Sequence, residues 1–130
     1  MEASMTQAAP GRALNIAAWV ASALGFLLYT VVASPPKLTN NPQAVEGFLK
    51  YGYSDGFRLF IGTCELLGGI ALLIPRLAFW SACGLFIIML GAAHAHLTHD
   101  EASHLPVVIV ALVLLPFIAW VRRPQALFLS

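Results

Sequence analysis

Four long apolar runs, separated by short charged segments, decide what this chain can fold into. They cover residues 14–33, 59–75, 77–97 and 105–121. A helix needs about 20 mainly apolar residues to cross a bilayer, within a range of about 17–25, and all four runs fall inside that range. We therefore predict an all-α integral membrane protein, a four-helix bundle in which each run forms one span. The first run is longer than the apolar part of a typical signal peptide, so we interpret it as a retained span.

The composition supports lipid as the solvent. Hydrophobic residues make up 59% of the 130 residues and charged residues only 10%, whereas soluble domains usually carry about 25% charged residues. A short chain cannot bury so much apolar surface in one water-soluble core. The net charge of +1 and the absence of any Lys/Arg run exclude a nucleic-acid-binding protein.

Basic residues predict the orientation of the spans. With four spans, the 1–13 tail, the 75–77 turn and the 122–130 tail lie on one side, and they carry Arg12, Arg76, Arg122 and Arg123. The opposite side carries Lys37, Lys50 and Arg58, diluted by four acidic residues. Because cytoplasmic loops are enriched in Lys and Arg, we predict that both termini are cytoplasmic.

The first outer loop contains a short helix of its own. Asn41 is a suitable N-cap, Pro42 suits the first helical position, and Gly52 suits the position just past the end. We interpret this segment as an interfacial helix on the bilayer surface, anchored by Tyr51 and Tyr53. The alternative, which is compatible with the first, is a lid over a cavity between the spans.

Glu65 lies near the middle of the second run and is the most informative residue in the chain. A carboxylate there costs about 2.5–3.5 kcal/mol on insertion scales, so it normally faces the interior and pairs with another group. Its helical neighbours include Gly62, Gly68 and Gly69, and such small residues allow close helix contact in membranes. Glu65 is therefore predicted to point into the bundle.

Three further residues are expected at the same outer half of the bundle. Lys37 closes the first run, Arg58 lies seven residues before Glu65, and His94 lies near the outer end of the third run on one face with Gly84 and Gly91. One hypothesis is a polar pocket in which Glu65 and His94 exchange protons with the head group of a bound quinone, held by Lys37 and Arg58. The alternative is a polar clasp that keeps the helices in register.

The remaining histidines and the cysteines suggest weaker hypotheses. His96, His99 and Asp100 fit one helical face, and His104 could complete a set of metal ligands, but histidines at a membrane boundary are commonly just solvated, and we predict no metal site. All histidines lie between 94 and 104, which disfavours haem held between two spans. Cys64 and Cys83 differ in depth by roughly 13 Å at 1.5 Å per residue, too far for a disulfide.

Several of these segments resemble the DoxX-like family in order and spacing, from about Leu14 to Val121. They are Lys37-Leu38-Thr39, Glu65-Leu66-Leu67-Gly68-Gly69 with Pro75, and Gly91-Ala92 with His94. The resemblance implies a four-helix protein of the inner membrane of a bacterium, with Lys37, Glu65 and His94 at motif positions. It also implies two different roles, since some members belong to a thiosulfate:quinone oxidoreductase and a distant animal relative is a chaperone for nicotinic receptors.

Two functions follow as hypotheses. The first is a quinone-linked oxidoreductase subunit, which would need a partner protein because the chain offers no haem ligand pair, cluster cysteines or disulfide pair. The alternative is a non-enzymatic membrane protein that binds a lipid-like molecule or assists assembly of another membrane protein. Proton-coupled transport is less favoured, because the chain has no internal repeat. A homo-oligomer or a subunit of a membrane complex is expected in each case.

Overall fold

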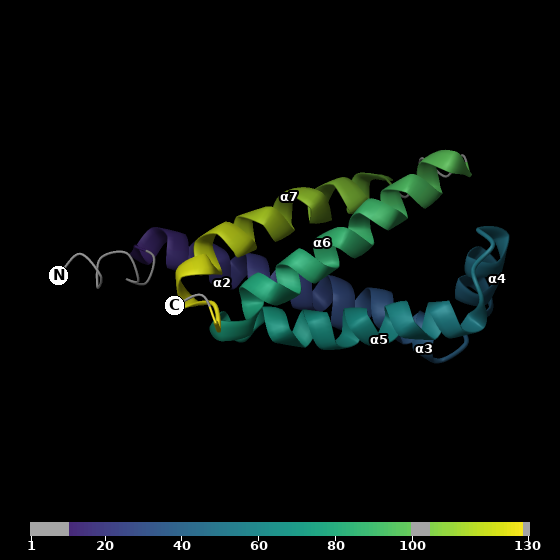
Figure 1. The fold of residues 1–130 in the computed structure, drawn as a ribbon, viewed down its shortest axis with the longest axis horizontal. Helices are drawn as coiled ribbons and strands as arrows, with labels where there is room; N and C mark the ends of the chain where they lie inside the picture. The colour runs from purple at the N-terminus through teal and green to yellow at the C-terminus, as the bar shows by residue number, and fades with distance from the viewer. Residues whose placement is uncertain (1–10, 100–104, 129–130) are drawn as a thin grey trace.

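The computed structural model describes residues 11–99 and 105–128, and every regular element in those two ranges is a helix (Figure 1). This confirms the all-α prediction. In chain order the elements are α2 (Arg12–Phe26), η1 (Leu27–Ala33), α3 (Ser34–Leu38), α4 (Pro42–Lys50), α5 (Asp55–Leu72), α6 (Pro75–Thr98), α7 (Leu105–Arg122) and η3 (Arg123–Gln125).

The first helical stretch runs without a break from Arg12 to Leu38 and includes α2, η1 and α3. The apolar run ends at Ala33, but the helix continues through Pro35 and Pro36. A proline inside a helix lacks an amide donor and its ring clashes with the preceding turn. The seven residues of η1 are π-helical, and directly before the two prolines the Ser34 amide donates to the Tyr29 carbonyl, five residues back.

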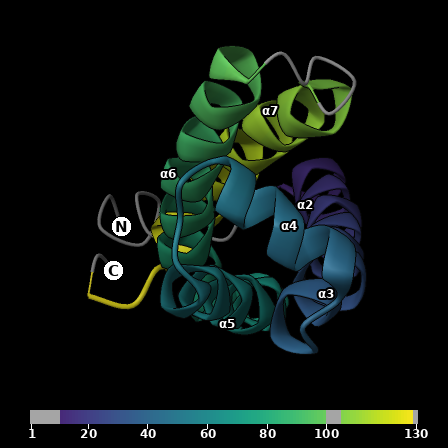
Figure 2. The ribbon, with the colours of Figure 1, turned by 90° about the vertical axis from the view of Figure 1, so that its right-hand side faces the viewer.

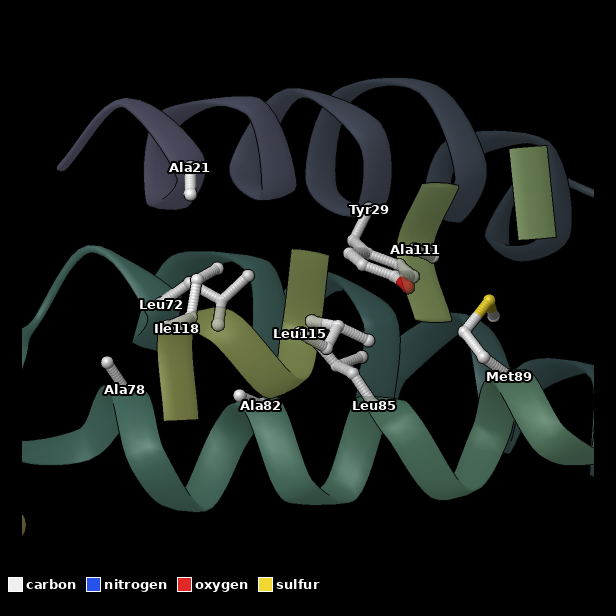
Figure 3. Packing of buried hydrophobic residues seen from close by; sticks show 10 residues of the cluster. All are labelled: Ala21, Tyr29, Leu72, Ala78, Ala82, Leu85, Met89, Ala111, Leu115 and Ile118. Atoms are coloured by element: carbon white, nitrogen blue, oxygen red, sulfur yellow. The ribbon is translucent and has the colours of Figure 1, made fainter. Parts of the chain in front are cut away.

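Three helical stretches among the described residues are long and apolar enough to cross a membrane. They are Arg12–Leu38, Pro75–Thr98 and Leu105–Gln125. The 18-residue helix α5 is more polar, because it contains Asp55, Arg58 and Glu65. It packs against α6, α3, η1 and α2, while α7 packs against α6 and α2. Figure 3 shows the apolar core where these helices meet.

Large apolar side chains also cover the outside of the molecule. Val20, Val32, Phe60, Ile87 and Val113 are each more than half exposed. A soluble monomer rarely exposes so large an apolar surface, whereas in a bilayer it contacts lipid tails. The chain is a membrane protein.

The start of α2, the turn between α5 and α6, and the end of α7 lie at one end of the molecule. Arg122 Nη1 donates to Asn15 Oδ1 over 2.7 Å, and the Leu127 amide donates to the Arg76 carbonyl over 2.9 Å. Arg122 is buried, also stacks over the Trp19 ring, and tethers the two ends of the described chain to each other.

At the opposite end, α4 lies across the other helices between α3 and α6 (Figure 2). The Asn41 side chain accepts from the Gln43 amide over 3.0 Å, and Gly52 has φ of +84°, as the predicted caps require. Tyr51 connects α4 to α6, since its hydroxyl lies 2.9 Å from His96 Nδ1 and its ring centroid 4.6 Å from that of His99. The helix therefore closes this end of the molecule.

Candidate functional site

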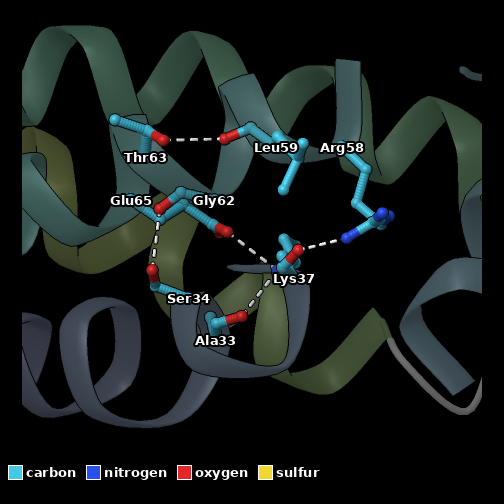
Figure 4. A network of polar contacts seen from close by, with 8 residues as sticks. All are labelled: Ala33, Ser34, Lys37, Arg58, Leu59, Gly62, Thr63 and Glu65. Carbon is cyan, nitrogen blue, oxygen red and sulfur yellow. Dashed lines mark hydrogen bonds and ion pairs between the residues drawn. The ribbon is translucent and has the colours of Figure 1, made fainter. Parts of the chain in front are cut away.

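A buried ion pair joins the first helical stretch to α5. Lys37 Nζ lies 2.7 Å from Glu65 Oε1, and the two side chains are 18% and 3% exposed (Figure 4). Lys37 Nζ also donates to the Ala33 carbonyl over 3.0 Å. The continuation of the helix beyond Ala33 makes this contact possible, because it carries Lys37 alongside α5 instead of into a loop. The pairing predicted for Glu65 is present, with Lys37 as its partner.

Hydroxyl groups and glycines bring the first helical stretch and α5 close together next to the ion pair. Ser34 Oγ donates to the Gly62 carbonyl over 2.7 Å, and Thr30 Oγ1 donates to the Leu66 carbonyl over 2.9 Å. A Cβ built on Gly62 would lie 2.9 Å from Lys37 Cβ, and one on Gly69 would overlap Thr30 Oγ1. The absence of side chains at these glycines therefore permits the close approach that places Lys37 beside Glu65.

Arg58 lies near the start of α5, seven residues before Glu65, and its side chain contacts the end of α3. It is buried, and its guanidinium donates to the Lys37 carbonyl and, over 2.9 Å, to Asn40 Oδ1. Asp55 Oδ1 lies 3.4 Å away. A cation is favourable at a helix C-terminus, and Asn40 itself has φ of +59°. Arg58 thus holds the chain at the end of the first helical stretch, and in this way it positions Lys37.

His94 lies apart from this cluster. Its side chain is exposed on α6, and within the described part of the chain no hydrogen bond or ion pair joins it to Lys37, Arg58 or Glu65. A Cβ at Gly84 or Gly91, which share its face, would meet no atom within 4 Å. This face of α6 points outward, so the geometry brings together three of the four predicted site residues and leaves His94 outside.

Tyr29 is an interior polar residue that the sequence analysis missed. Its side chain is 1% exposed, and its hydroxyl has no hydrogen-bond partner among the residues that the structure describes. Asn15, Ser22 and Tyr29 recur every seven residues along the first helical stretch, and Ser22 is also fully buried. This spacing places all three on one helical face, and it was the signal that could have identified Tyr29.

The comparisons with known proteins give the family. The sequence profile of the DoxX-like family matches residues 16–118, which include Lys37, Glu65 and His94. The chain belongs to the DoxX-like family. No curated protein and no solved structure shows significant similarity to it. The predicted resemblance is therefore confirmed, and the match covers the ion pair and the helices that hold it.

The two other described histidines of this DoxX-like protein contact the α4 end and not the ion pair. His96 and His99 contact Tyr51 at the α4 end, and no metal-ligand cluster occurs among the residues that the structure describes. Asp100 and His104, which completed the hypothetical metal set, lie outside those residues. Cys64 and Cys83 are both free.

An apolar groove runs along the seam between α2 and α7 of the DoxX-like protein. Two adjoining depressions, of about 310 and 510 Å³, share Leu24 and Leu114. The other lining residues are apolar. Leu28 and Val110 lie toward the α4 end, and Ala17 and Phe117 lie toward the opposite end. Such volumes are in the range of ligand pockets, and the groove opens toward the lipid-facing side.

Proposed function

We propose that this DoxX-like protein crosses the inner membrane of a bacterium four times, as a four-helix bundle with both termini in the cytoplasm. α5 is the span that adds to the three apolar stretches and makes four. Its Arg58 and Glu65 face partners inside the molecule and do not need to meet lipid. The end that holds Arg76, Arg122 and Arg123 is the cytoplasmic end by the positive-inside rule. α4 then lies at the outer surface.

Single-cysteine labelling tests this topology. In a Cys64→Ser/Cys83→Ser background, we expect Gly47→Cys to react with a membrane-impermeant maleimide in intact spheroplasts, because α4 faces outward. Gly11→Cys and Arg76→Cys are expected to react only after permeabilisation. Labelling of Arg76→Cys together with Gly47→Cys in intact spheroplasts would show that α5 does not cross the membrane.

We propose further that the protein binds a lipid-soluble molecule, with an apolar chain in the groove between α2 and α7. The groove carries this proposal, because a continuous apolar trough between two helices suits the apolar tail of a lipid-soluble ligand. The position of Lys37 and Glu65 in the outer half favours a quinone as that ligand. In that case the protein serves as a quinone-linked oxidoreductase subunit beside a redox partner. A lipid-like ligand bound without catalysis is the second candidate, favoured by the exposed position of His94.

Filling the groove tests ligand binding. Leu24 lines both depressions and is 54% exposed, so Leu24→Trp should block the tail without disturbing the core. We expect about tenfold weaker binding of decylbenzene, since displacing about two methylene groups at about 0.8 kcal/mol each already has that effect. Native mass spectrometry of the protein in mild detergent measures it.

Leu67→Trp is the matched control, because Leu67 is 59% exposed on α5 and does not line the groove. Equal binding by the wild type and Leu24→Trp would contradict the proposal, as would equal weakening by both tryptophan variants.

A further inference from the structure

The chain leaves the bundle after α3 and returns to it at α5, and one buried side chain fastens both points. Arg58 Nη2 donates to Asn40 Oδ1 over 2.9 Å where the chain leaves, and it lies 3.4 Å from Asp55 Oδ1 where the chain returns. We call the segment between these two residues, 41–54, the flap. Its two roots are held together, while α4 within it projects across the other helices (Figure 2).

The flap is held together by its own contacts. The centroids of the Phe48 and Tyr53 rings lie 6.0 Å apart, and the Tyr53 amide donates to the Phe48 carbonyl over 2.9 Å. None of the nine residues of α4 is buried, and segments with few buried contacts open at low free-energy cost. Asn40, at the first root, has φ of +59°, and residues at the ends of elements are the positions where hinges absorb changes of φ and ψ.

Tyr51 joins the far edge of the flap to α6. Its hydroxyl lies 2.9 Å from His96 Nδ1, and its ring centroid lies 4.6 Å from that of His99. Both histidines lie at the end of α6. The next residue, Gly52, has φ of +84° and turns the chain back toward α5. The flap thus extends from α3 and α5 to α6, and Tyr51 holds it there.

The bundle interior begins about one turn from this end of the helices. Val108, three residues from the start of α7, is 5% exposed and shares the buried face of α7 with Ala111 and Leu115. Lys37 on α3 is 18% exposed and lies beside the buried Glu65. Because α4 lies across this end (Figure 2), a water-soluble molecule that approaches from here meets the flap before it meets the interior.

From this arrangement we infer that the flap is a hinged cover over the α4 end of the bundle, closed by the contact of Tyr51 with α6. Its opening admits small water-soluble molecules to Lys37 and to the buried face of α7. The inference goes beyond the proposed ligand binding, because it concerns entry from the aqueous phase and does not involve the α2/α7 groove.

Cysteine accessibility tests the cover. Val108→Cys in the Cys64→Ser/Cys83→Ser background places one thiol on the buried face of α7. The probe is methanethiosulfonate ethyltrimethylammonium, which is charged and reacts from water, applied to the purified protein in detergent micelles. We expect Tyr51→Phe to raise the reaction rate about fivefold, because the rate follows the open fraction and the loss of one hydrogen bond changes that fraction by about this factor.

Tyr53→Phe is the matched control, because it removes a hydroxyl from the same flap, and its ring packs on Phe48 and Phe57, not on α6. The movement itself is measured by double electron–electron resonance between nitroxides at Gly47→Cys and Gly91→Cys. A Cβ at either position meets nothing within 4 Å. We expect Tyr51→Phe to add a longer distance to the distribution.

The outcomes decide between a cover and a fixed helix. Equal rates of Val108→Cys with and without Tyr51→Phe, including no reaction in either, would overturn the inference. A faster reaction without a longer nitroxide distance would assign the effect to loosening of α7. A similar increase with Tyr53→Phe would assign it to loosening within the flap, and either result would contradict closure by Tyr51.

Discussion

Replacing Lys37 by methionine is expected to lower the free energy of unfolding by about 3–5 kcal/mol, the usual effect of removing one partner of a buried ion pair. The Glu65 side chain is 3% exposed, so the variant leaves a carboxylate in an apolar interior without its cation. Denaturant unfolding in detergent micelles, followed by circular dichroism, measures the loss. Arg76→Met is the control, because the Arg76 side chain is exposed at the turn between α5 and α6.

The double variant Lys37→Met/Glu65→Leu decides what the pair is for. Replacing both members of a buried ion pair by apolar residues is often neutral or stabilising, so we expect stability close to that of the wild type. If the double variant is stable and still binds decyl-benzoquinone, the pair is a clasp between α3 and α5. If it is stable and does not bind, the pair belongs to the ligand site. A single variant Lys37→Met as stable as the wild type would contradict the interior ion pair itself.

Gly69→Ala is expected to destabilise the protein by about 1–3 kcal/mol, the usual range for overpacking a tight contact. The added methyl group would overlap Thr30 Oγ1 and lie 3.1 Å from the Thr30 amide nitrogen, so the first helical stretch and α5 would have to separate. Thermal unfolding in detergent micelles measures the change. Gly84→Ala serves as the control, since its Cβ would meet nothing within 4 Å and alanine is the better helix former.

Removing the obstacle should restore the stability of that variant. Thr30→Ala takes away the oxygen that the new methyl group meets, and it also removes the hydrogen bond to the Leu66 carbonyl. We therefore expect Thr30→Ala/Gly69→Ala to recover part of the loss. If Gly69→Ala and Gly84→Ala have equal effects, close contact at Gly69 does not hold α5 in place.

The glycines and the carboxylate of α5 could be predicted from the sequence because each has a strong physical requirement. A charge in an apolar run must face inward, and clustered small residues mark a close contact. The partner of Glu65 was harder to choose, since Lys37, Arg58 and His94 all lay at a suitable depth. Lys37 follows two prolines, which usually end a helix, so its place beside α5 depends on a continuation that local sequence rules disfavour.

The exposed position of His94 could not be predicted for a different reason. α6 is apolar on nearly all sides, so its sequence carries no periodic pattern to indicate which face packs inward. Glycines at 84 and 91 suggested a contact face, but they have open space beside them. Tyr29 escaped notice because a tyrosine in an apolar run resembles core packing. Its seven-residue spacing from Ser22 was the one sequence signal for an interior face, and the structure adds that its hydroxyl has no acceptor among the described residues.

The π-helical segment η1 also changes the rotational phase of the first helical stretch. Seven residues wound in wider turns turn the second half of the helix by roughly a third of a revolution relative to a uniform α-helix. The first half can thus direct Ser22 and Tyr29 to the interior, while the second half directs Ser34 and Lys37 to α5. The wider turns thus accommodate about one extra residue between the two halves, so loss of one residue between 27 and 33 would let this segment wind as an ordinary α-helix and would keep the second half facing Glu65.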